Sequence, residues 1–309
     1  MASSPDGPLV CPNCRAPLSA KAEGLGCAQC GGEYPVANGI ADFSGGHYYD
    51  VFSDEGALSA EARAGFEAEY AGTLRRIADF YEPLLRRAGV RTVLDCGAGN
   101  GIGVDSLNSS GYDAWGLDLS AVRRWQWNSR IFRHKLVVAD ALRLPFAEGY
   151  FDAVISSGVI EHIGVAEHRS PAYTVSPLPE RDALRTEFLR ELLRVSNAIV
   201  FVDSPNGRFP IDFWHATHLA KPRFHRLDEG FLPTMREICR LAREIDPRAT
   251  VTAISPYKRL QFKQSSAHWF GRLLRTPGDL FFRAMTLRPF RWIAGTALNP
   301  YLVVEIRKN

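Results

Sequence analysis

Short apolar runs alternate with amphipathic stretches along most of the chain. Runs that are rich in β-branched and aromatic side chains and bounded by polar or glycine positions predict buried strands. We expect such strands at residues 92–94, 112–117, 136–139, 151–156, 198–202, 249–254 and 301–306.

The stretches between these runs carry apolar residues at spacings of three and four, which is typical of helices with one buried face. The longest such stretch, residues 59–88, carries Phe66, Tyr70, Leu74, Ile77, Tyr81 and Leu84 at these spacings. Further helices are expected at residues 102–110, 180–195 and 230–245. Strands that alternate with helices in this way predict an α/β fold.

The first strand runs into a glycine-rich turn, VLDCGAGNGIG, at residues 93–103. Asp95 is followed by Gly97, Gly99 and Gly101 at every second position. Glycines permit positive φ and let a ligand lie against the main chain, and the start of the next helix offers N–H groups. A carboxylate at Asp95 would repel a pyrophosphate but suits a cationic cofactor with an amino group, which favours S-adenosylmethionine over NAD.

With this D-x-G-x-G-x-G spacing, the chain resembles the class I S-adenosylmethionine-dependent methyltransferases. The resemblance implies a Rossmann-like, doubly wound sheet of seven strands in the order 3-2-1-4-5-7-6. It also implies that Asp118 accepts hydrogen bonds from both ribose hydroxyls and that Asp140 contacts the adenine amino group. Asp140 has a second interpretation as the N-cap of a helix, and the two roles are compatible. The cofactor residues expected are Asp95, Cys96, Gly97, Ala98, Gly99, Gly101, Asp118, Leu119, Asp140, Ala141, Leu142 and Ser157.

The fourth strand leads into a polar segment, and FDAVISSGVIEHI is similar to the corresponding part of type 11 methyltransferases, which act on quinones, sugars and small metabolites. His162 is the candidate general base for a hydroxyl acceptor, with Glu161 beside it. The alternative is that this pair only positions the chain around the cofactor. The motif differs from the Asn/Asp-Pro-Pro-aromatic tetrapeptide of exocyclic amino-group methyltransferases, so adenine and cytosine amino groups are poor candidates.

Four of the six cysteines, Cys11, Cys14, Cys27 and Cys30, follow a C-x2-C-x12-C-x2-C pattern. This spacing predicts a closed structural Zn2+ site, with a disulfide pair as the alternative. The segment resembles the Trm112-like zinc ribbons, which implies a folding and interaction module. We therefore expect a zinc ribbon at residues 1–44, a linker with helices at 45–90 and a methyltransferase domain at 91–309.

Length and composition suit one large α/β domain with a small additional module, because 46% of the 309 residues are apolar and 23% are charged. The N-terminus lacks a signal-peptide pattern, and no apolar run is long enough for a membrane span, so we expect a cytoplasmic protein.

The C-terminal part is strongly basic and contains an aromatic insertion at about 257–299. From residue 258 onward, ten Lys and Arg residues against two acidic residues give +8, so the preceding part carries −5 of the total of +3. Such a segment favours peripheral contact with anionic lipid at the inner face of a membrane, with phosphate of nucleic acid as the less favoured partner. The alternative is a helical insertion with a solvated basic face.

Together these features predict O-methylation of a small metabolite, glycan or lipid-linked glycan. One alternative is an RNA base methyltransferase, since ribosomal guanine methyltransferases also combine a zinc module with this fold. A second is a non-catalytic binding protein, although acids at three successive strand ends speak against it. His215 and His218 suggest another metal site, but without a third ligand at firm spacing we interpret them as structural.

Overall fold

The computed structural model describes residues 7–50, 69–168, 174–215, 223–259 and 269–308, with the backbone alone for 168 and 269–275. The chain forms two compact units, one comprising Met1–Ile155 with Glu191–Ala198 and the other Ser156–Arg190 with Ile199–Asn309.

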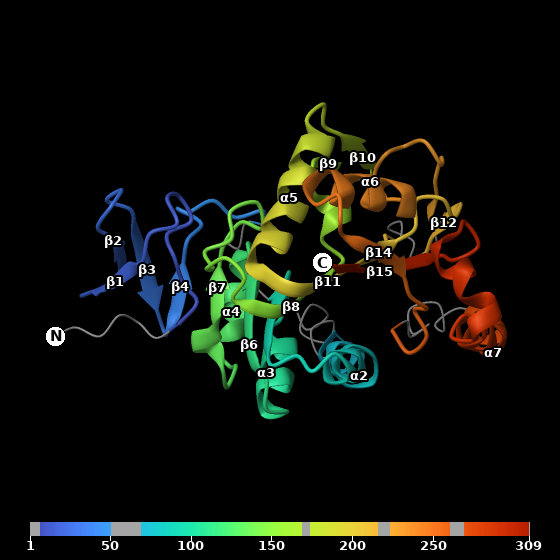
Figure 1. Cartoon of the computed structure of the whole chain (residues 1–309), viewed down its shortest axis with the longest axis horizontal. Helices are drawn as coiled ribbons and strands as arrows, with labels where there is room; N and C mark the ends of the chain where they lie inside the picture. The colour runs from blue at the N-terminus through green and yellow to red at the C-terminus, as the bar shows by residue number, and fades with distance from the viewer. Residues whose placement is uncertain (1–6, 51–68, 169–173, 216–222, 260–268, 309) are drawn as a thin grey trace. The chain divides into compact units, whose positions relative to one another are not determined.

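The first unit contains a sheet in which the small N-terminal strands continue the edge of a parallel arrangement (Figure 1). Its order is β1-β2-β3-β4-β7-β6-β5-β8. The strands are β1 (Leu18–Lys21), β2 (Gly24–Cys27), β3 (Glu33–Ala37), β4 (Ile40–Asp42), β5 (Thr92–Cys96), β6 (Asp113–Asp118), β7 (Leu136–Val138) and β8 (Phe151–Ser157). The first four pair antiparallel, whereas β4 with β7, β7 with β6 and β6 with β5 are parallel.

Helices of this unit follow the predicted alternation. They are a helical stretch over residues 69–76, the π-helix η2 (Ile77–Tyr81), α2 (Glu82–Arg87), α3 (Ile102–Ser109), α4 (Ala121–Trp127) and the 3-10 helix η3 (Arg133–Lys135). The helix predicted at 59–88 is confirmed from residue 69 onward, and its earlier part with Phe66 lies outside the described residues. A buried cluster joins Ile40 of the ribbon segment to Trp127, Leu136 and Val138, so burial of apolar surface stabilises the two parts together.

The second unit contains an antiparallel arrangement, β11-β15-β14. Its elements are η4 (Ile160–His162), β9 (Val165–His168), β10 (Thr174–Pro177), α5 (Arg181–Val195), β11 (Ser196–Pro205), β12 (Ile211–Asp212), β13 (Arg223–Phe224), α6 (Met235–Ile245), β14 (Thr250–Ala253), α7 (Trp269–Ala284), η6 (Arg288–Gly295) and β15 (Tyr301–Arg307). Helix α5 and strand β11 begin or end in the first unit.

The predicted α/β class is confirmed. The expected order appears within each unit, as 3-2-1 in β7-β6-β5 and as 5-7-6 in β11-β15-β14. One helix start was wrong, because α6 begins at Met235 rather than at residue 230. Thr234 has an extended backbone and its Oγ1 accepts the Glu237 N–H at 3.1 Å, which caps the helix there. Among the described helices, none is long and apolar enough to cross a bilayer.

Candidate functional site

The turn after β5 has the left-handed backbone that its glycine spacing predicts. Gly97, Gly99 and Gly101 have φ of 86°, 52° and 75°. Gly101 is the N-cap of α3, and a Cβ there would lie 2.7 Å from Leu136 Cδ1, so a larger residue is excluded both by its φ and by space. The N–H groups at 97 and 98 donate to Leu117 O at 2.9 and 2.8 Å, which ties the turn to β6.

Asp95 lies at the end of β5, is only 1% exposed, and sits against the first turn of α3. A Cβ on Gly103 would come within 2.6 Å of Asp95 Oδ2, so the helix approaches this carboxylate only because residue 103 is glycine. The N-terminal end of a helix favours a negative charge. The neighbouring Cys96 and Ala98 are buried as well.

Asp118 ends β6 and is linked directly to the glycine turn. Its Oδ2 accepts the Gly99 N–H at 3.0 Å. Loss of solvent around the carboxylate raises the pKa of Asp118 to about 6, although the Gly99 N–H and the charge of Arg123 act in the opposite direction. The carboxylate is thus held at the turn and titrates just below neutral pH.

Asp140 follows β7 by two residues and closes a tight turn. Its Oδ1 accepts the Leu142 N–H at 2.9 Å, and its carbonyl accepts the Arg143 N–H at 3.0 Å. Residues 141–150 contain no helix, so the alternative of a helix N-cap was wrong and the side chain caps a turn instead. Leu119, Ala141 and Leu142 are partly exposed beside these acids.

Residues 47–50, whose composition suggests only a linker, contact the residues around Asp118 and the start of α4. Asp50 Oδ1 accepts the Ala121 N–H at 2.7 Å and thereby caps α4. The Tyr49 N–H donates to Leu119 O at 3.3 Å, which places this segment beside the residue that follows Asp118. Glu69 pairs with Arg123 at 2.9 Å. No periodicity or motif in the sequence indicates these residues.

The four predicted metal-binding cysteines lie together. Their sulfur atoms are within 4.8 Å of one another, with Cys11 and Cys30 at 3.5 Å and Cys14 and Cys27 at 3.4 Å. Two similar turns present them, because the N–H groups of Arg15 and Gly31 donate to the carbonyls of Cys11 and Cys27. Arg15 and Gly31 both have a left-handed backbone, with φ of 64° and 74°. Four thiolates at this spacing match a closed tetrahedral site.

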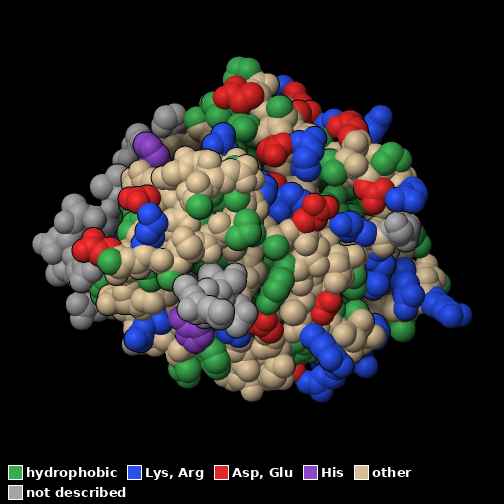
Figure 2. All heavy atoms as spheres, turned by 60° about the vertical axis from the view of Figure 1, so that its left-hand side comes forward, with side chains coloured by type: hydrophobic (Ala, Val, Ile, Leu, Met, Phe, Trp, Pro, Cys, Tyr) green, Lys and Arg blue, Asp and Glu red, His purple; other side chains and the backbone are tan. Residues whose placement is uncertain are grey.

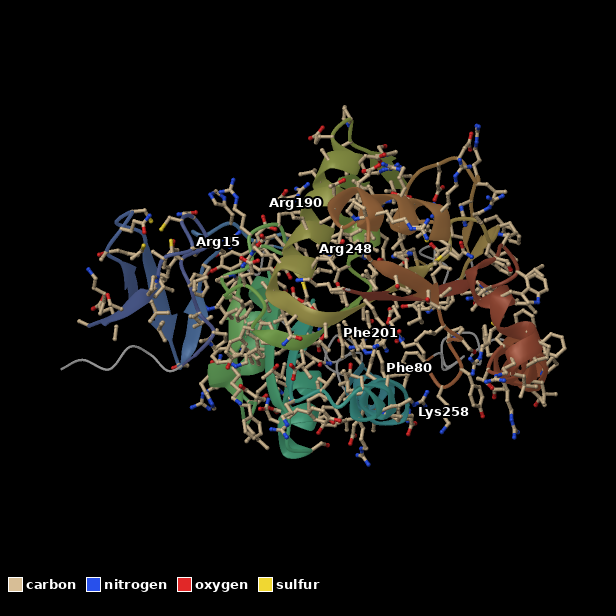
Figure 3. All side chains as sticks on the ribbon, in the orientation of Figure 1. Arg15, Phe80, Arg190, Phe201, Arg248 and Lys258 are labelled. Carbon is tan, nitrogen blue, oxygen red and sulfur yellow. The ribbon has the colours of Figure 1, made fainter. Side chains whose placement is uncertain are left out.

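Arg15 also links the cysteine cluster to the remainder of the first unit (labelled in Figure 3). Its guanidinium donates to Leu144 O at 2.6 Å and to Glu191 Oε2 at 2.9 Å. Glu191 is 3% exposed and also accepts the Leu144 N–H at 2.8 Å. One arginine therefore connects the first turn of the ribbon to a buried carboxylate.

Glu161 and His162, the predicted catalytic pair, lie on η4 in the second unit. Glu161 is 2% exposed, and burial raises its pKa although the charges of His162 and His215 act against this. His162 Nδ1 is paired with Glu167 Oε1. His215, expected to be structural, lies in the same cluster, with its ring centroid 5.4 Å from that of His162. His218 lies outside the described residues.

Ser157, predicted to bind the cofactor, belongs to a second polar cluster of this unit. Its Oγ accepts from Arg259 at 2.6 Å, and Arg259 also donates to both oxygens of Asp203 at 2.8 Å. The Tyr301 hydroxyl donates to Asp203, and burial raises the pKa of this phenol well above its usual range. Arg259 lies in the basic insertion, where the sequence interpretation counted its charge but did not identify it as a partner of Ser157.

Part of the chain matches a known family of domains. Residues 94–174 match the family model of a methyltransferase domain, a segment that contains Asp95, Asp118, Asp140, Glu161 and His162. No curated protein matches the chain.

Three solved structures are among those to which the chain is similar. The plantazolicin methyltransferase BamL, in complex with a desmethyl analog and SAH, is 14% identical, covers 82% of this chain and 92% of its own, and has a TM-score of 0.47. The magnesium protoporphyrin IX methyltransferase of Synechocystis, with bound SAM, is 11% identical, covers 77% of this chain and 81% of its own, and has a TM-score of 0.41. A SAM-dependent methyltransferase of Archaeoglobus fulgidus is 16% identical, covers 80% of this chain and 99% of its own, and has a TM-score of 0.41.

Proposed function

We propose that this protein transfers the methyl group of S-adenosylmethionine to an oxygen atom of a small metabolite, glycan or lipid-linked glycan. The methyltransferase-domain match supports an S-adenosylmethionine-dependent methyltransferase. The observation that carries the proposal is the set of acids after three adjacent parallel strands, Asp95, Asp118 and Asp140, with a left-handed glycine turn between the first two.

The residues of the first unit fit this cofactor chemically. Gly97, Gly99 and Gly101 leave the main chain open to close approach, and Asp118 offers a carboxylate to a vicinal diol. Asp140 would accept from the adenine amino group, and Asp95 would favour the cationic amino acid portion. When bound, the cofactor supplies a sulfonium-activated methyl carbon, and the chain's task is to align the acceptor in a water-poor site.

On the acceptor side, His162 is the candidate general base. Its pairing with Glu167 would fix the orientation of the ring, so that the opposite ring nitrogen can accept a hydroxyl proton.

The four cysteines would hold Zn2+ in a structural site. Four thiolates leave no open coordination position, so no catalytic step is assigned to this ion. A segment of this size builds only a small core, here Leu18 and Tyr34 with two of the cysteines, so the metal would supply much of its stability.

Peripheral contact with anionic lipid is proposed for the segment from α7 to η6. Exposed apolar side chains and exposed arginines are interleaved there, namely Leu280, Leu287, Phe290 and Trp292 with Arg283, Arg288 and Arg291. On the face drawn in Figure 2, by comparison, basic and acidic side chains of the described residues are interspersed. Vesicle flotation tests the contact: binding to anionic but not neutral vesicles at low salt is expected, and its absence contradicts the contact.

The proposed activity is tested in two steps. Calorimetry with S-adenosylhomocysteine should show binding to the wild-type chain and none to Asp118→Ala. If the wild-type chain gives no heat with S-adenosylhomocysteine or with S-adenosylmethionine, the proposal is contradicted. Transfer of labelled methyl groups to cell lysate then identifies the acceptor. Label in organic-soluble or glycan material supports the proposed acceptors, whereas label in RNA supports a base methyltransferase instead.

A further inference from the structure

We propose that Glu161, His162 and His215 bind a divalent transition-metal ion in the second unit, separate from the four-cysteine site. One candidate ligand atom from each residue lies within 4.8 Å of the others. Around an ion about 2.1 Å from each nitrogen and oxygen ligand, such atoms are about 3 to 4 Å apart. A small inward movement of the side chains would therefore complete three coordination bonds.

Glu161 provides independent evidence for a cation. Its side chain is 2% exposed, and its Oε2 has no hydrogen-bond partner among the described residues. A buried carboxylate oxygen without a partner is costly, so such groups are normally paired or bound to metal. A metal ion between this oxygen and two imidazoles would supply the missing partner.

The two histidines are oriented in the manner of metal ligands. His162 Nδ1 is paired with Glu167, and His215 Nδ1 with Asp212 Oδ2 at 2.8 Å. A carboxylate on one ring nitrogen fixes the tautomer and directs the opposite nitrogen, Nε2, to the metal.

Asp212 is itself fixed. It is fully buried and accepts the N–H groups of Trp214 and His215 at 2.9 and 3.1 Å. Its Oδ2 accepts from the His215 ring at 2.8 Å and lies 3.5 Å from the Arg223 guanidinium, so charged and polar partners hold the carboxylate in place. It would act as a positioning residue for His215.

The donor set indicates the class of ion. Two imidazole nitrogens and one carboxylate oxygen suit Zn2+, Fe2+ or Mn2+ better than Mg2+ or Ca2+, which prefer oxygen ligands alone. The four thiolates of the cysteine cluster favour softer ions and bind Mn2+ poorly, so Mn2+ distinguishes the proposed site from the cysteine site. Three protein ligands also leave positions open for another molecule, as in catalytic rather than structural sites.

If the proposed function holds, the open position would receive the acceptor hydroxyl. A hydroxyl bound to the ion would release its proton to a water molecule, and its oxygen would form the bond to the methyl carbon as the carbon–sulfur bond breaks with its electron pair going to sulfur. This consequence rests on the proposed function, whereas the metal site does not. His162 would then be a ligand rather than the base.

Binding of Mn2+ to the full chain tests the site without cofactor or acceptor. Weakly bound metal is first removed with a mild chelator, and metal analysis checks that zinc at the cysteines is retained. Loss of the free Mn2+ resonance signal should reveal one site per chain, and calorimetry with Zn2+ should give the same stoichiometry.

Matched variants locate the ion. Glu161→Gln and His215→Ala should each weaken binding at least tenfold, and Asp212→Asn by about 10- to 100-fold. Glu187→Gln, on the exposed side of α5, should bind as the wild type does. Thermal melts ensure that each variant is folded.

Two results would overturn the site: neither ion binds the folded wild-type chain at this stoichiometry, or Glu161→Gln binds as tightly as the wild type. A separate measurement tests whether the ion takes part in methyl transfer. Methyl transfer that stops on chelation and returns with Mn2+ supports it, whereas transfer that continues without metal returns His162 to the role of base. S-adenosylhomocysteine binding is measured in parallel, so failure of the metal site is distinguishable from failure of the proposed function.

Discussion

Asp118 places cofactor affinity and stability in opposition. Its pKa of about 6 lies above the usual value of 3.8, so the carboxyl destabilises the fold when it is ionised, and stability from this group increases as pH falls from about 6 toward 4. If Asp118 binds the ribose as proposed, the diol would in contrast be bound best by the ionised form. Protonation of Asp118 would then stabilise the fold and weaken cofactor binding.

We expect the affinity for S-adenosylhomocysteine to decrease as pH falls through about 6, because Asp118 becomes protonated. Calorimetry between pH 5 and 8 measures this effect. Asp118→Asn should bind at least tenfold more weakly, lose this part of the pH dependence, and melt at the same or a higher temperature. A variant that keeps the wild-type pH profile would show that another group is responsible.

Substitution of Gly103 tests how closely α3 packs against Asp95. Gly103→Ala would place a Cβ 2.6 Å from Asp95 Oδ2, so the start of α3 or the carboxylate must move. Overpacking of this kind costs about 1 to 3 kcal/mol, and we expect weaker cofactor binding as well as a lower melting temperature.

Gly72→Ala is the control for this substitution. A Cβ at residue 72 meets nothing within 4 Å, and the residue lies within a helix, so this change should stabilise the protein by up to about 1 kcal/mol. Equal melting temperatures for the two variants would refute the packing argument.

Among the elements, the two cysteine turns differ at one informative position. Arg15 and Gly31 have the same left-handed backbone, which costs a non-glycine residue about 1 kcal/mol. At residue 15 this unfavourable backbone conformation is offset by the side chain, which donates hydrogen bonds to Leu144 and Glu191.

We predict that Arg15→Ala destabilises the protein more than Arg15→Gly, by about 1 kcal/mol, since both remove the contacts but only glycine relieves the backbone. The side chain is 37% exposed, so the ion pair itself contributes only about 1 kcal/mol. Chemical denaturation with zinc bound measures the difference. If alanine is the more stable variant, backbone strain at this turn is excluded.

The elements themselves could largely be predicted from the sequence. Strands β5, β6 and β8 and helix α3 begin and end within a residue or two of their expected positions, because apolar runs and glycine turns are local signals. The pairing of β4 with β7 could not be predicted, since it joins Ala41 to Val137 and depends on long-range packing. The start of α6 was also missed, because Thr234 was not recognised as its cap.

For the whole molecule, the first unit's sites were more predictable than the second unit's. The glycine turn and the paired cysteines are compact motifs, so their residues are brought together by local geometry. His215 stands far from His162 in the sequence, and only folding of the second unit places the two rings together. Its partner Asp212 likewise belongs to no motif.

Deletion of residues 1–44 should cause self-association. Strand β4 pairs with one edge of β7, and its removal would expose unpaired N–H and C=O groups there. Light scattering of the truncated chain should detect oligomers or aggregates that the full chain lacks. A monodisperse truncated protein would show that β7 is protected in another way.

The parallel pairing of β4 with β7 has a consequence for protein synthesis. Val137 emerges from the ribosome almost a hundred residues after Ala41, a delay of about 5 to 20 s at ordinary elongation rates. If the four cysteines bind zinc as proposed, they are available to the ion before β7 has been synthesised. The N-terminal segment would then fold around its metal first, and β7 would pair afterwards with a strand β4 that is already formed.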